Sequence, residues 1–404
     1  MGRVFSRVLS LTLTGLLTLP LLSGLFTLPA QAADKVTINV YNWGQYISDG
    51  TDDYIDVNRA FTEATGIEVN YMTFDTNESL YTKLKTGGST YDVIVPSDYM
   101  AGRLIDEGMV QKLDFDNIPN YQYVGEAYKS TAYDPDNEYS VPYTWGTVGV
   151  IYNKKYVDEK DLGSWNLLWN SKYAGKILMF DNNRDAFAIA EASLGYSLNT
   201  QDPQELRNCA DYLEQQKPLV QQYVMDQIFD KMTREEAWIA PYYAGDYLTM
   251  VEDNPDLGFF FPEESFNLFI DCLMIPSSAE HKTEAEAYIN FLLQPEICGE
   301  NLDYLGYSAP EEAAKEYMDP EIAASDIAYP SEETLARSEA FLYLPGETNQ
   351  LMDSLWLEVK TDGGADSTQQ LIISAVVIGV ILLLLALYSL RKKRRKARRC
   401  RAWK

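Results

Sequence analysis

Carboxylates beside aromatic residues, at the ends of expected strands, are the feature of this sequence that most suggests chemistry. Asp185 follows the strand-like run 176–180, Asp246 ends the run Tyr-Tyr-Ala-Gly-Asp, and Asp271 interrupts the apolar stretch 267–275. An acid in an apolar strand needs partners or a ligand cation, because burying an unpaired charge is costly. Aromatic faces cover methylene groups and attract ammonium groups, while carboxylates hold charged ends. This combination predicts a site for a linear cation, and an elongated polyamine has that shape and charge.

Two further aromatic residues, Trp43 and Tyr46, leave the end of the first expected strand, 36–43. The stretch Pro-Ser-Asp-Tyr at 96–99 leaves another expected strand, 91–95. In a parallel sheet, ligands bind at the carboxyl ends of strands. We therefore expect both loops to open on one crevice, with Trp43 and Tyr46 as walls of a cation site.

Most enzyme classes lack their reacting groups in this chain. It has one histidine, His281, in a polar turn, and no nucleophile elbow, phosphate loop, Cys-x-x-Cys pair or His-Glu-x-x-His motif. We predict a binding protein rather than an enzyme, with no cofactor and no metal. Two alternatives stay open. One is an anchored extracellular glycosidase with Asp185 and Asp271 as paired carboxylates. The other is a ferric-ion-binding protein, and it rests on the resemblance of the adjacent Tyr242 and Tyr243 to the paired iron ligands of ferric-binding proteins.

The elements that would position these residues alternate between strands and helices. After the strand 36–43 we expect a helix at 54–65, a strand at 67–74, a helix at 77–85 capped by Asn77, and the strand 91–95. This βαβαβ order predicts a parallel sheet with helices on its faces. A second α/β unit starts at 148–153. Its expected strands are 176–180, 238–243, 257–261 and 267–275, and its expected helices are 185–194, 203–216 and 283–293.

The two ends of the chain predict export and membrane attachment. Residues 1–33 combine two arginines, an apolar run and an Ala-x-Ala type cleavage site, which indicates a secretory signal peptide. Residues 371–390 are 20 positions without a charge, enough for a transmembrane helix. The basic tail 391–404 then predicts a cytoplasmic C terminus, and 361–370 would be a linker. We therefore expect a single-pass cell-membrane protein with an extracellular or periplasmic binding domain.

The part between these ends is acidic and large enough for two domains. The chain has a formal net charge of −27, and all of its 60 acidic residues lie between the two terminal segments. Such a field repels nucleic acid and concentrates cations. About 330 residues exceed a single typical core. Cys209, Cys272 and Cys298 are expected to be mostly buried thiols rather than a disulfide scaffold.

Several dispersed motifs carry a resemblance to a known family. They are Tyr-Asn-Trp-x-x-Tyr-Ile from Tyr41, Phe-Asp-x-Asn-Glu from Phe74, Tyr-Asp-Val-Ile-Val-Pro-Ser from Tyr91, Val-Pro-Tyr-x-Trp-Gly from Val141, Ser-Trp-x-x-Leu-Trp from Ser164 and Leu-Gly-Tyr-Ser from Leu194. From about 36 to 359 the chain resembles the bacterial spermidine/putrescine-binding proteins of ABC importers. The resemblance implies an α/β, two-lobed periplasmic-binding-protein (Venus flytrap) fold with hinge closure on the ligand. Lobe 1 is expected at 34–145 and 272–320, and lobe 2 at 146–271 and 321–360.

The resemblance also implies which residues contact the ligand. They are Trp43, Tyr46, Ser97, Tyr99, Asn182, Asp185, Tyr243, Asp246, Phe269 and Asp271. Tyr243 stands where the family usually has Trp, and Phe269 stands where spermidine binders have Trp but putrescine-specific relatives have Phe. Asp246 resembles the acid of a putrescine-type Trp-Ala-Gly-Asp motif. Asn182 replaces an acid of spermidine-preferring members, and Phe341 replaces a Gln. These departures favour a diamine such as putrescine over spermidine. The expected function is thus that of a monomeric, membrane-anchored receptor that captures a polyamine and delivers it to ABC permease subunits.

Overall fold

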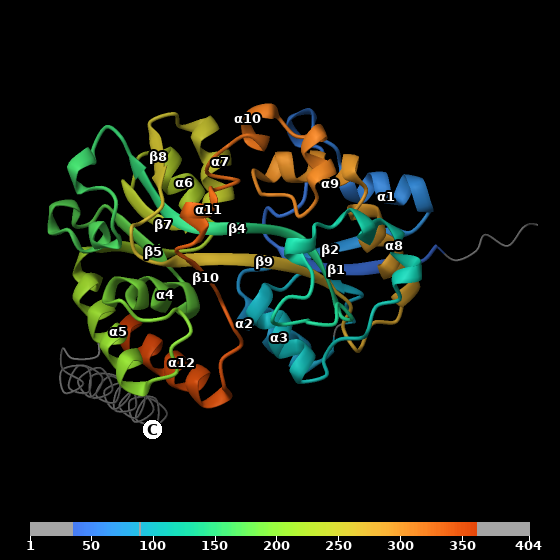
Figure 1. Ribbon diagram of the computed structural model, residues 1–404, viewed down its shortest axis with the longest axis horizontal. Coiled ribbons are helices and arrows are strands. Elements are labelled where there is room, and N and C mark those ends of the chain that lie inside the picture. Colours follow the sequence, from blue (N-terminus) through green and yellow to red (C-terminus); the bar gives the residue numbers. More distant parts are fainter. Residues whose placement is uncertain (1–34, 89, 362–404) are drawn as a thin grey trace, which may run out of the picture. The chain divides into compact units, whose positions relative to one another are not determined.

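Ten strands and the helices around them make up the part of the chain that the computed structural model describes, residues 35–88 and 90–361 (Figure 1). The strands are β1 (Thr37–Trp43), β2 (Glu68–Phe74), β3 (Val93–Ile94), β4 (Ser140–Asn153), β5 (Ile177–Phe180), β6 (Val220–Val224), β7 (Ile239–Tyr243), β8 (Leu257–Phe260), β9 (Phe266–Met274) and β10 (Ser338–Ala340). The α-helices are α1 (Val57–Thr65), α2 (Asn77–Thr86), α3 (Asp98–Asp106), α4 (Asn183–Leu194), α5 (Pro203–Gln216), α6 (Gln227–Thr233), α7 (Ala244–Asp253), α8 (Lys282–Leu292), α9 (Pro295–Leu305), α10 (Pro320–Ala323), α11 (Glu332–Leu335) and α12 (Gly346–Lys360).

The strands form one sheet with a parallel unit at each end. The main order is β2-β1-β3-β9-β4-β7-β5-β6, with β10 beside β9 and β8 beside β4. β1 is parallel to β2 and β3, and β5 is parallel to β6 and β7. The long strands β4 and β9 are antiparallel to each other and run between the two units (Figure 1). Two α/β units joined by crossing strands are the two-lobed architecture that the sequence predicted.

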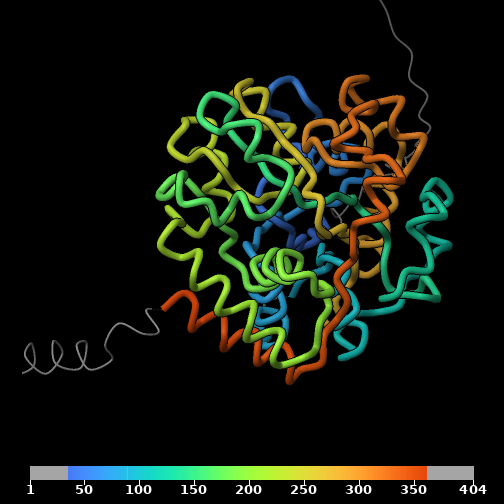
Figure 2. Tube along the Cα trace, turned by 60° about the vertical axis from the view of Figure 1, so that its left-hand side comes forward, coloured from blue at the N-terminus to red at the C-terminus, as the bar shows by residue number. Residues whose placement is uncertain are grey.

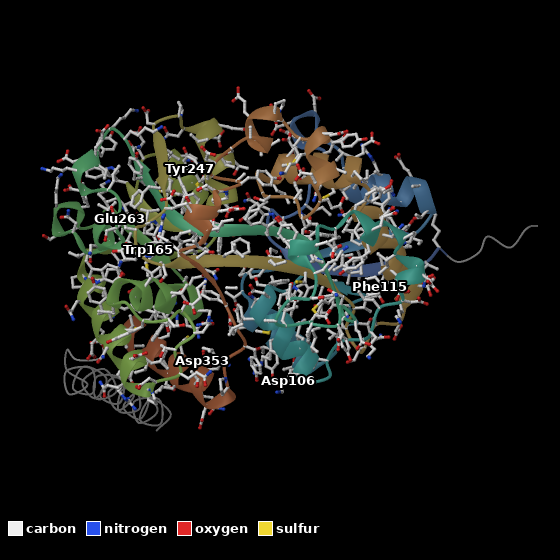
Figure 3. All side chains as sticks on the ribbon, in the orientation of Figure 1. Asp106, Phe115, Trp165, Tyr247, Glu263 and Asp353 are labelled. Atoms are coloured by element: carbon white, nitrogen blue, oxygen red, sulfur yellow. The ribbon has the colours of Figure 1, made fainter. Side chains whose placement is uncertain are left out.

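Helices cover both faces of the sheet, as the βαβ pattern requires. In Figure 1, α2 to α5 and α12 lie on one face, while α1, α6, α7 and α9 lie on the other. The C-terminal helix α12 packs along α5, as the tube in Figure 2 shows. Asp353 of α12, labelled in Figure 3, also accepts a hydrogen bond from Asn183 Nδ2 of α4 at 2.6 Å. These contacts attach the last described helix to the unit that contains β5 to β7.

Local sequence signals explain most of these elements. β1 alternates half-buried and buried residues, and almost every residue of the crossing strand β4 is buried. α5 begins where Asp202 accepts hydrogen bonds from the backbone N–H groups of Gln204 and Glu205, which is the standard role of an N-cap aspartate. α1 ends at Gly66, whose φ of 78° is in the left-handed region that glycine tolerates best.

Some predicted boundaries are wrong by a few residues. The cap of α2 is Thr76 rather than Asn77, because the Thr76 hydroxyl accepts the Ser79 N–H at 3.1 Å while Asn77 is already helical. The first helix begins at Val57 instead of residue 54, because the Asp56 side chain caps it by accepting from Arg59 N–H at 2.9 Å. β6 was not predicted. The expected buried thiols are confirmed, since Cys209, Cys272 and Cys298 are free and buried.

The predicted transmembrane helix requires a correction. Its residues, 371–390, lie outside the described part of the chain, as do the expected signal peptide at 1–33, most of the linker at 361–370 and the basic tail at 391–404. Among residues 35–88 and 90–361, no helix is both long and apolar enough to cross a bilayer. The last described helix, α12, has 15 residues and carries charged side chains, whereas a span needs about 20 apolar residues. The two-lobed fold is therefore retained without a transmembrane helix.

Candidate functional site: an acidic, aromatic pocket

One pocket brings together the residues that the sequence singled out. It encloses about 840 Å³ of empty volume, part of which is open to solvent. All ten predicted residues line it, namely Trp43, Tyr46, Ser97, Tyr99, Asn182, Asp185, Tyr243, Asp246, Phe269 and Asp271. Seven acidic residues and no lysine, arginine or histidine occur among the described residues of its lining. The pocket is therefore suited to a cation.

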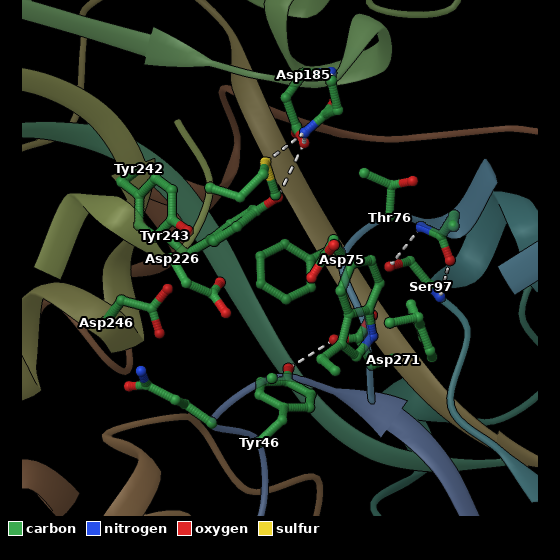
Figure 4. Close-up of a pocket in the computed structure, with 18 of the residues that line it drawn as sticks. Tyr46, Asp75, Thr76, Ser97, Asp185, Asp226, Tyr242, Tyr243, Asp246 and Asp271 are labelled. Carbon is green, nitrogen blue, oxygen red and sulfur yellow. Dashed lines mark hydrogen bonds between the residues drawn. The ribbon is translucent and has the colours of Figure 1, made fainter. Parts of the chain in front are cut away.

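Loops from both parallel units build the pocket. Trp43 ends β1 and Tyr46 lies in the loop after it, Asp75 follows β2, Tyr243 ends β7, and Asp226 lies just after β6. β2 and β6 are at opposite ends of the main strand order, yet the loops that follow them meet in this pocket (Figure 4). The rule that ligand sites form beyond the carboxyl ends of strands thus located the crevice.

Asp185 is the first carboxylate centre, and the start of α4 holds it in place. The Asn182 side chain caps this helix by accepting the Asp185 backbone N–H at 2.8 Å, and its Nδ2 donates to Asp185 Oδ2 at 2.8 Å. The Tyr243 hydroxyl donates to the same oxygen at 2.9 Å (Figure 4). Burial raises the pKa of Asp185, while these two donors oppose that rise. Asn182 and Tyr243 thus orient a carboxylate that can still accept from a ligand.

Asp271 is the second centre and projects from the middle of β9. It is 4% exposed, and the Tyr46 hydroxyl donates to its Oδ2 at 2.6 Å (Figure 4). Tyr46 is itself held by Tyr143, whose hydroxyl donates to the Tyr46 carbonyl at 2.8 Å. The other oxygen, Asp271 Oδ1, has no hydrogen-bond partner among the described residues. Burial raises the pKa of Asp271 to about 6, although the side chains of Tyr46 and Ser97 lower it.

Asp246 and Asp226 form a third acidic region on the side of α6 and α7. Asp246 is in the first turn of α7, and burial raises its pKa to about 8, although the Tyr307 hydroxyl opposes this and the charge of Asp226 adds to it. Desolvation in the pocket and the charge of Asp75 raise the pKa of Asp226, although Asp226 is exposed to solvent. Like charges this close cannot all be ionised at little cost. A cationic ligand would relieve this repulsion.

Aromatic rings form the walls between these carboxylates. Trp43 packs on Phe74 with ring centroids 4.6 Å apart, and Phe269 packs edge-on against Tyr243 at 5.4 Å. An added Cβ at Gly146 would lie 2.8 Å from the Phe269 ring, so the absence of a side chain there gives this ring its space. Trp43 Nε1 has no hydrogen-bond partner in the described chain. Such walls suit the methylene chain and the ammonium groups of an amine.

Ser97 and Tyr99 contribute mainly to the order of the wall. Asn77 Nδ2 donates to Ser97 Oγ at 3.1 Å, and Ser97 N–H donates to Asn77 Oδ1 at 3.2 Å. The Tyr99 hydroxyl donates to Glu78 Oε1 at 2.9 Å. Ser97 also forms a backbone bridge with Asp271. These contacts connect α2 and α3 to the strand that carries the second carboxylate.

Several lining residues were missed by the sequence reasoning. They are Asp75, Glu78, Asp98, Asp226 and Tyr307, all of which line the pocket. Asp75 and Glu78 belong to the Phe-Asp-x-Asn-Glu motif directly after β2, and that position was the available signal. Asp226 had no such signal because β6 was not predicted. Tyr307 follows α9, and only the folded chain places it against Tyr46, with ring centroids 5.1 Å apart.

The pocket is a poor site for ferric ion. Burial raises the pKa of both Tyr242 and Tyr243 well above the usual range, and nearby aspartates add to the rise. Phenolates are therefore disfavoured at these positions, and the Tyr243 hydroxyl already donates to Asp185. No group of three or more His, Cys, Asp or Glu side chains within 35–88 and 90–361 is arranged to hold a metal ion.

Comparison with known proteins agrees with this geometry. The sequence profile of the bacterial extracellular solute-binding proteins matches residues 57–330. The spermidine/putrescine-binding periplasmic protein of Salmonella typhimurium is 33% identical over 77% of this chain and 88% of its own length. The putrescine-binding periplasmic protein SpuD of Pseudomonas aeruginosa is 31% identical over 82% of this chain and 94% of its own.

A solved structure shows the same fold. The spermidine/putrescine ABC transporter substrate-binding protein PotD of Streptococcus pneumoniae is 36% identical, with a TM-score of 0.68 over 81% of this chain and 99% of its own. These similarities confirm the predicted family and two-lobed fold. The names of the relatives from Salmonella and Pseudomonas place those proteins in the periplasm. The predicted single-pass membrane localisation with a cytoplasmic C terminus is therefore wrong by this comparison and is not retained.

Proposed function

The chain belongs to the bacterial extracellular solute-binding proteins, and we propose that it captures a polyamine such as putrescine or spermidine for delivery to the permease of an ABC importer. It is a binding protein and not an enzyme, as its family indicates. The observation that carries the proposal is the pocket itself, in which seven carboxylates and several aromatic rings occur without a lining base among the described residues. Neither the glycosidase nor the ferric alternative is retained.

Each part of the pocket has a role in this proposal. Asp185, oriented by Asn182 and Tyr243, accepts one terminal ammonium group. Asp271 accepts the other through Oδ1, which has no partner among the described residues. Trp43 and Phe269 cover the methylene chain between them, where ammonium groups also benefit from cation–π contact.

Closure around the ligand follows from the position of the pocket between the two parallel units. We take 34–145 with 272–320 as one lobe and 146–271 with 321–360 as the other, with β4 and β9 crossing between them. The pairing of Ser140–Thr147 of β4 with Leu268–Met274 of β9 supports this division. Hinge closure brings ligand-binding residues of both lobes onto one ligand and excludes water. We expect a monomer that binds one ligand.

Calorimetric titration of the full-length protein with putrescine, cadaverine, spermidine and spermine tests the proposal. Tight one-to-one binding of at least one of these amines is expected. Agmatine, which has one guanidinium end, and lysine, which adds a carboxylate, serve as matched comparison ligands. Absence of binding heat with all four polyamines, in a protein with a cooperative thermal transition, would reject the function.

A further inference from the structure

Asp226 lines the pocket but is not one of the ten predicted ligand residues. It directly precedes α6 and follows the edge strand β6. In Figure 4 its carboxylate points into the open centre of the pocket, from the side that also carries Asp246. Asp75, which follows the opposite edge strand β2, lies across from it. Asp226 is therefore positioned to meet a ligand from one unit while Asp75 approaches from the other.

The surroundings of Asp226 provide no protein cation for its charge. No hydrogen bond or ion pair connects its carboxylate to another side chain of the described chain, whereas Asp185, Asp271 and Glu78 each accept from a tyrosine. The carboxylate instead lies against Gly44, because a Cβ added to Gly44 would be 2.5 Å from Asp226 Oδ2. The φ of Gly44 is not in the left-handed region. Glycine at position 44 is therefore explained by the Asp226 carboxylate, which occupies the space that a side chain would need.

The unpaired oxygen of Asp271 indicates, independently of Asp226, that the pocket receives a ligand. Asp271 is 4% exposed, faces the pocket, and its Oδ1 has no hydrogen-bond partner within residues 35–88 and 90–361. A buried carboxylate oxygen is normally paired. Asp271 and Asp185 account for two ammonium groups, and Asp226 with Asp75 forms a separate acidic pair. The lining therefore has more anionic centres than a diamine can neutralise.

We propose that Asp226 is a specificity-determining residue that receives an additional amino group, so that the pocket prefers a triamine to a diamine. This inference rests on the proposed function and adds the ligand class to it. It reverses the preference for a diamine that the replacements at Asn182, Tyr243, Phe269 and Phe341 favoured. The additional ammonium group sits between Asp226 and Asp75 and offsets their mutual repulsion, while the two terminal sites remain as described.

Two variants of the full-length protein test this assignment by calorimetry with spermidine and putrescine. Asp226→Asn removes the charge and keeps the size. Gly44→Ala keeps the charge but forces the carboxylate away, at little cost to the fold, because the end of a flexible side chain is all that must move. Asp230→Asn is the matched control, since Asp230 is on the same helix and forms only a surface ion pair with Arg234 at 2.8 Å.

We expect Asp226→Asn to raise the spermidine Kd by about 5- to 50-fold, the range of one charge-assisted hydrogen bond at a site open to solvent. The putrescine Kd should change by less than about threefold. Gly44→Ala should repeat this pattern, and Asp230→Asn should leave both constants unchanged. Thermal melts of each variant verify that the fold is intact.

Three results would overturn the assignment. An equal loss for both amines in Asp226→Asn would mean that the residue acts only through the general field of the pocket. Unchanged binding of both amines would mean that it does not contact the ligand. If the wild-type protein binds neither amine, the proposed function itself fails, and that outcome is recognised before any variant is compared.

Discussion

Replacement of Asp271 by asparagine should change ligand affinity and the stability of the empty protein in opposite directions. The carboxyl is buried in β9, and burial raises its pKa from the usual 3.8 to about 6. The unfolded chain therefore loses its proton at lower pH than the folded protein does. Stability is then reduced progressively as the pH rises from about 4 through 6, and the full cost is present at pH 8. Asparagine has no charge to bury and keeps an oxygen that can accept from Tyr46.

The magnitudes follow from these two effects. A pKa that rises from 3.8 to about 6 corresponds to roughly 3 kcal/mol at pH 8. Replacing a charged acceptor for Tyr46 by a neutral one returns about 1 kcal/mol of this. The ligand-free variant should thus be more stable by about 1–2 kcal/mol at pH 8 and nearly unchanged at pH 4. The ligand loses a charge-assisted hydrogen bond, so affinity should fall by about 10- to 100-fold.

Chemical denaturation at pH 4 and pH 8, without ligand, measures the first effect, and calorimetry at pH 8 measures the second. Asp326→Asn is the control, because Asp326 is an exposed aspartate that does not line the pocket. A variant that is less stable than wild type at pH 8, with an unchanged unfolding slope, would refute the claim that Asp271 is buried at a cost. Unchanged affinity for every amine would refute its role as a ligand acceptor.

Three other predictions concern the pocket and a second buried acid. Amine binding should weaken as the pH falls below about 6, because Asp271 then keeps its proton. Binding near pH 7 should release protons from Asp246, because burial raises the pKa of this residue to about 8. Titrations in buffers of different ionisation enthalpy measure this release, and buffer-independent heats would contradict it. Trp43→Ala should weaken amine binding by about 5- to 30-fold, because the cation–π contact is lost. Trp43→Phe should retain most of the affinity. Equal losses in the two variants would contradict the claim that an aromatic ring at position 43 contacts the ligand. Glu311 is fully buried, and both of its carboxylate oxygens lack a partner among the described residues. Burial raises its pKa from 4.5 to about 8. Glu311→Gln should therefore stabilise the protein by about 2–4 kcal/mol at pH 8 and have little effect at pH 4, and urea unfolding at both pH values would measure this.

Much of the fold and part of the pocket could be predicted because local patterns carry them. Asp271 was recognisable because an acid within an apolar strand is rare without a reason. Trp43 and Tyr46 were recognisable because they leave a strand at its carboxyl end, where parallel sheets bind ligands. The α/β class followed from alternating periodicities, and helices such as α5 followed from their caps.

The errors and omissions have equally local causes. β6 was missed because Gln221 and Gln222 leave it without a run of apolar residues, and most of the strand is half-buried or exposed. Asp226 was missed with it. The single-pass localisation was inferred from the hydropathy of 371–390 and not from the binding domain, and the comparison with periplasmic relatives did not bear it out.

The residue types of the site could be read from the amino-acid sequence: acids and aromatic rings stand at strand ends in a chain with one histidine. The family could be recognised as well, because the motifs that identify it are short and contiguous. Which acids share a pocket, and which of their oxygens are already paired, depends on the folded chain. Asp75 and Asp226 follow strands at opposite ends of the sheet order, and Asp271 meets Tyr46 across 225 positions of sequence. Such contacts depend on how two units close on each other, and no local periodicity encodes that closure.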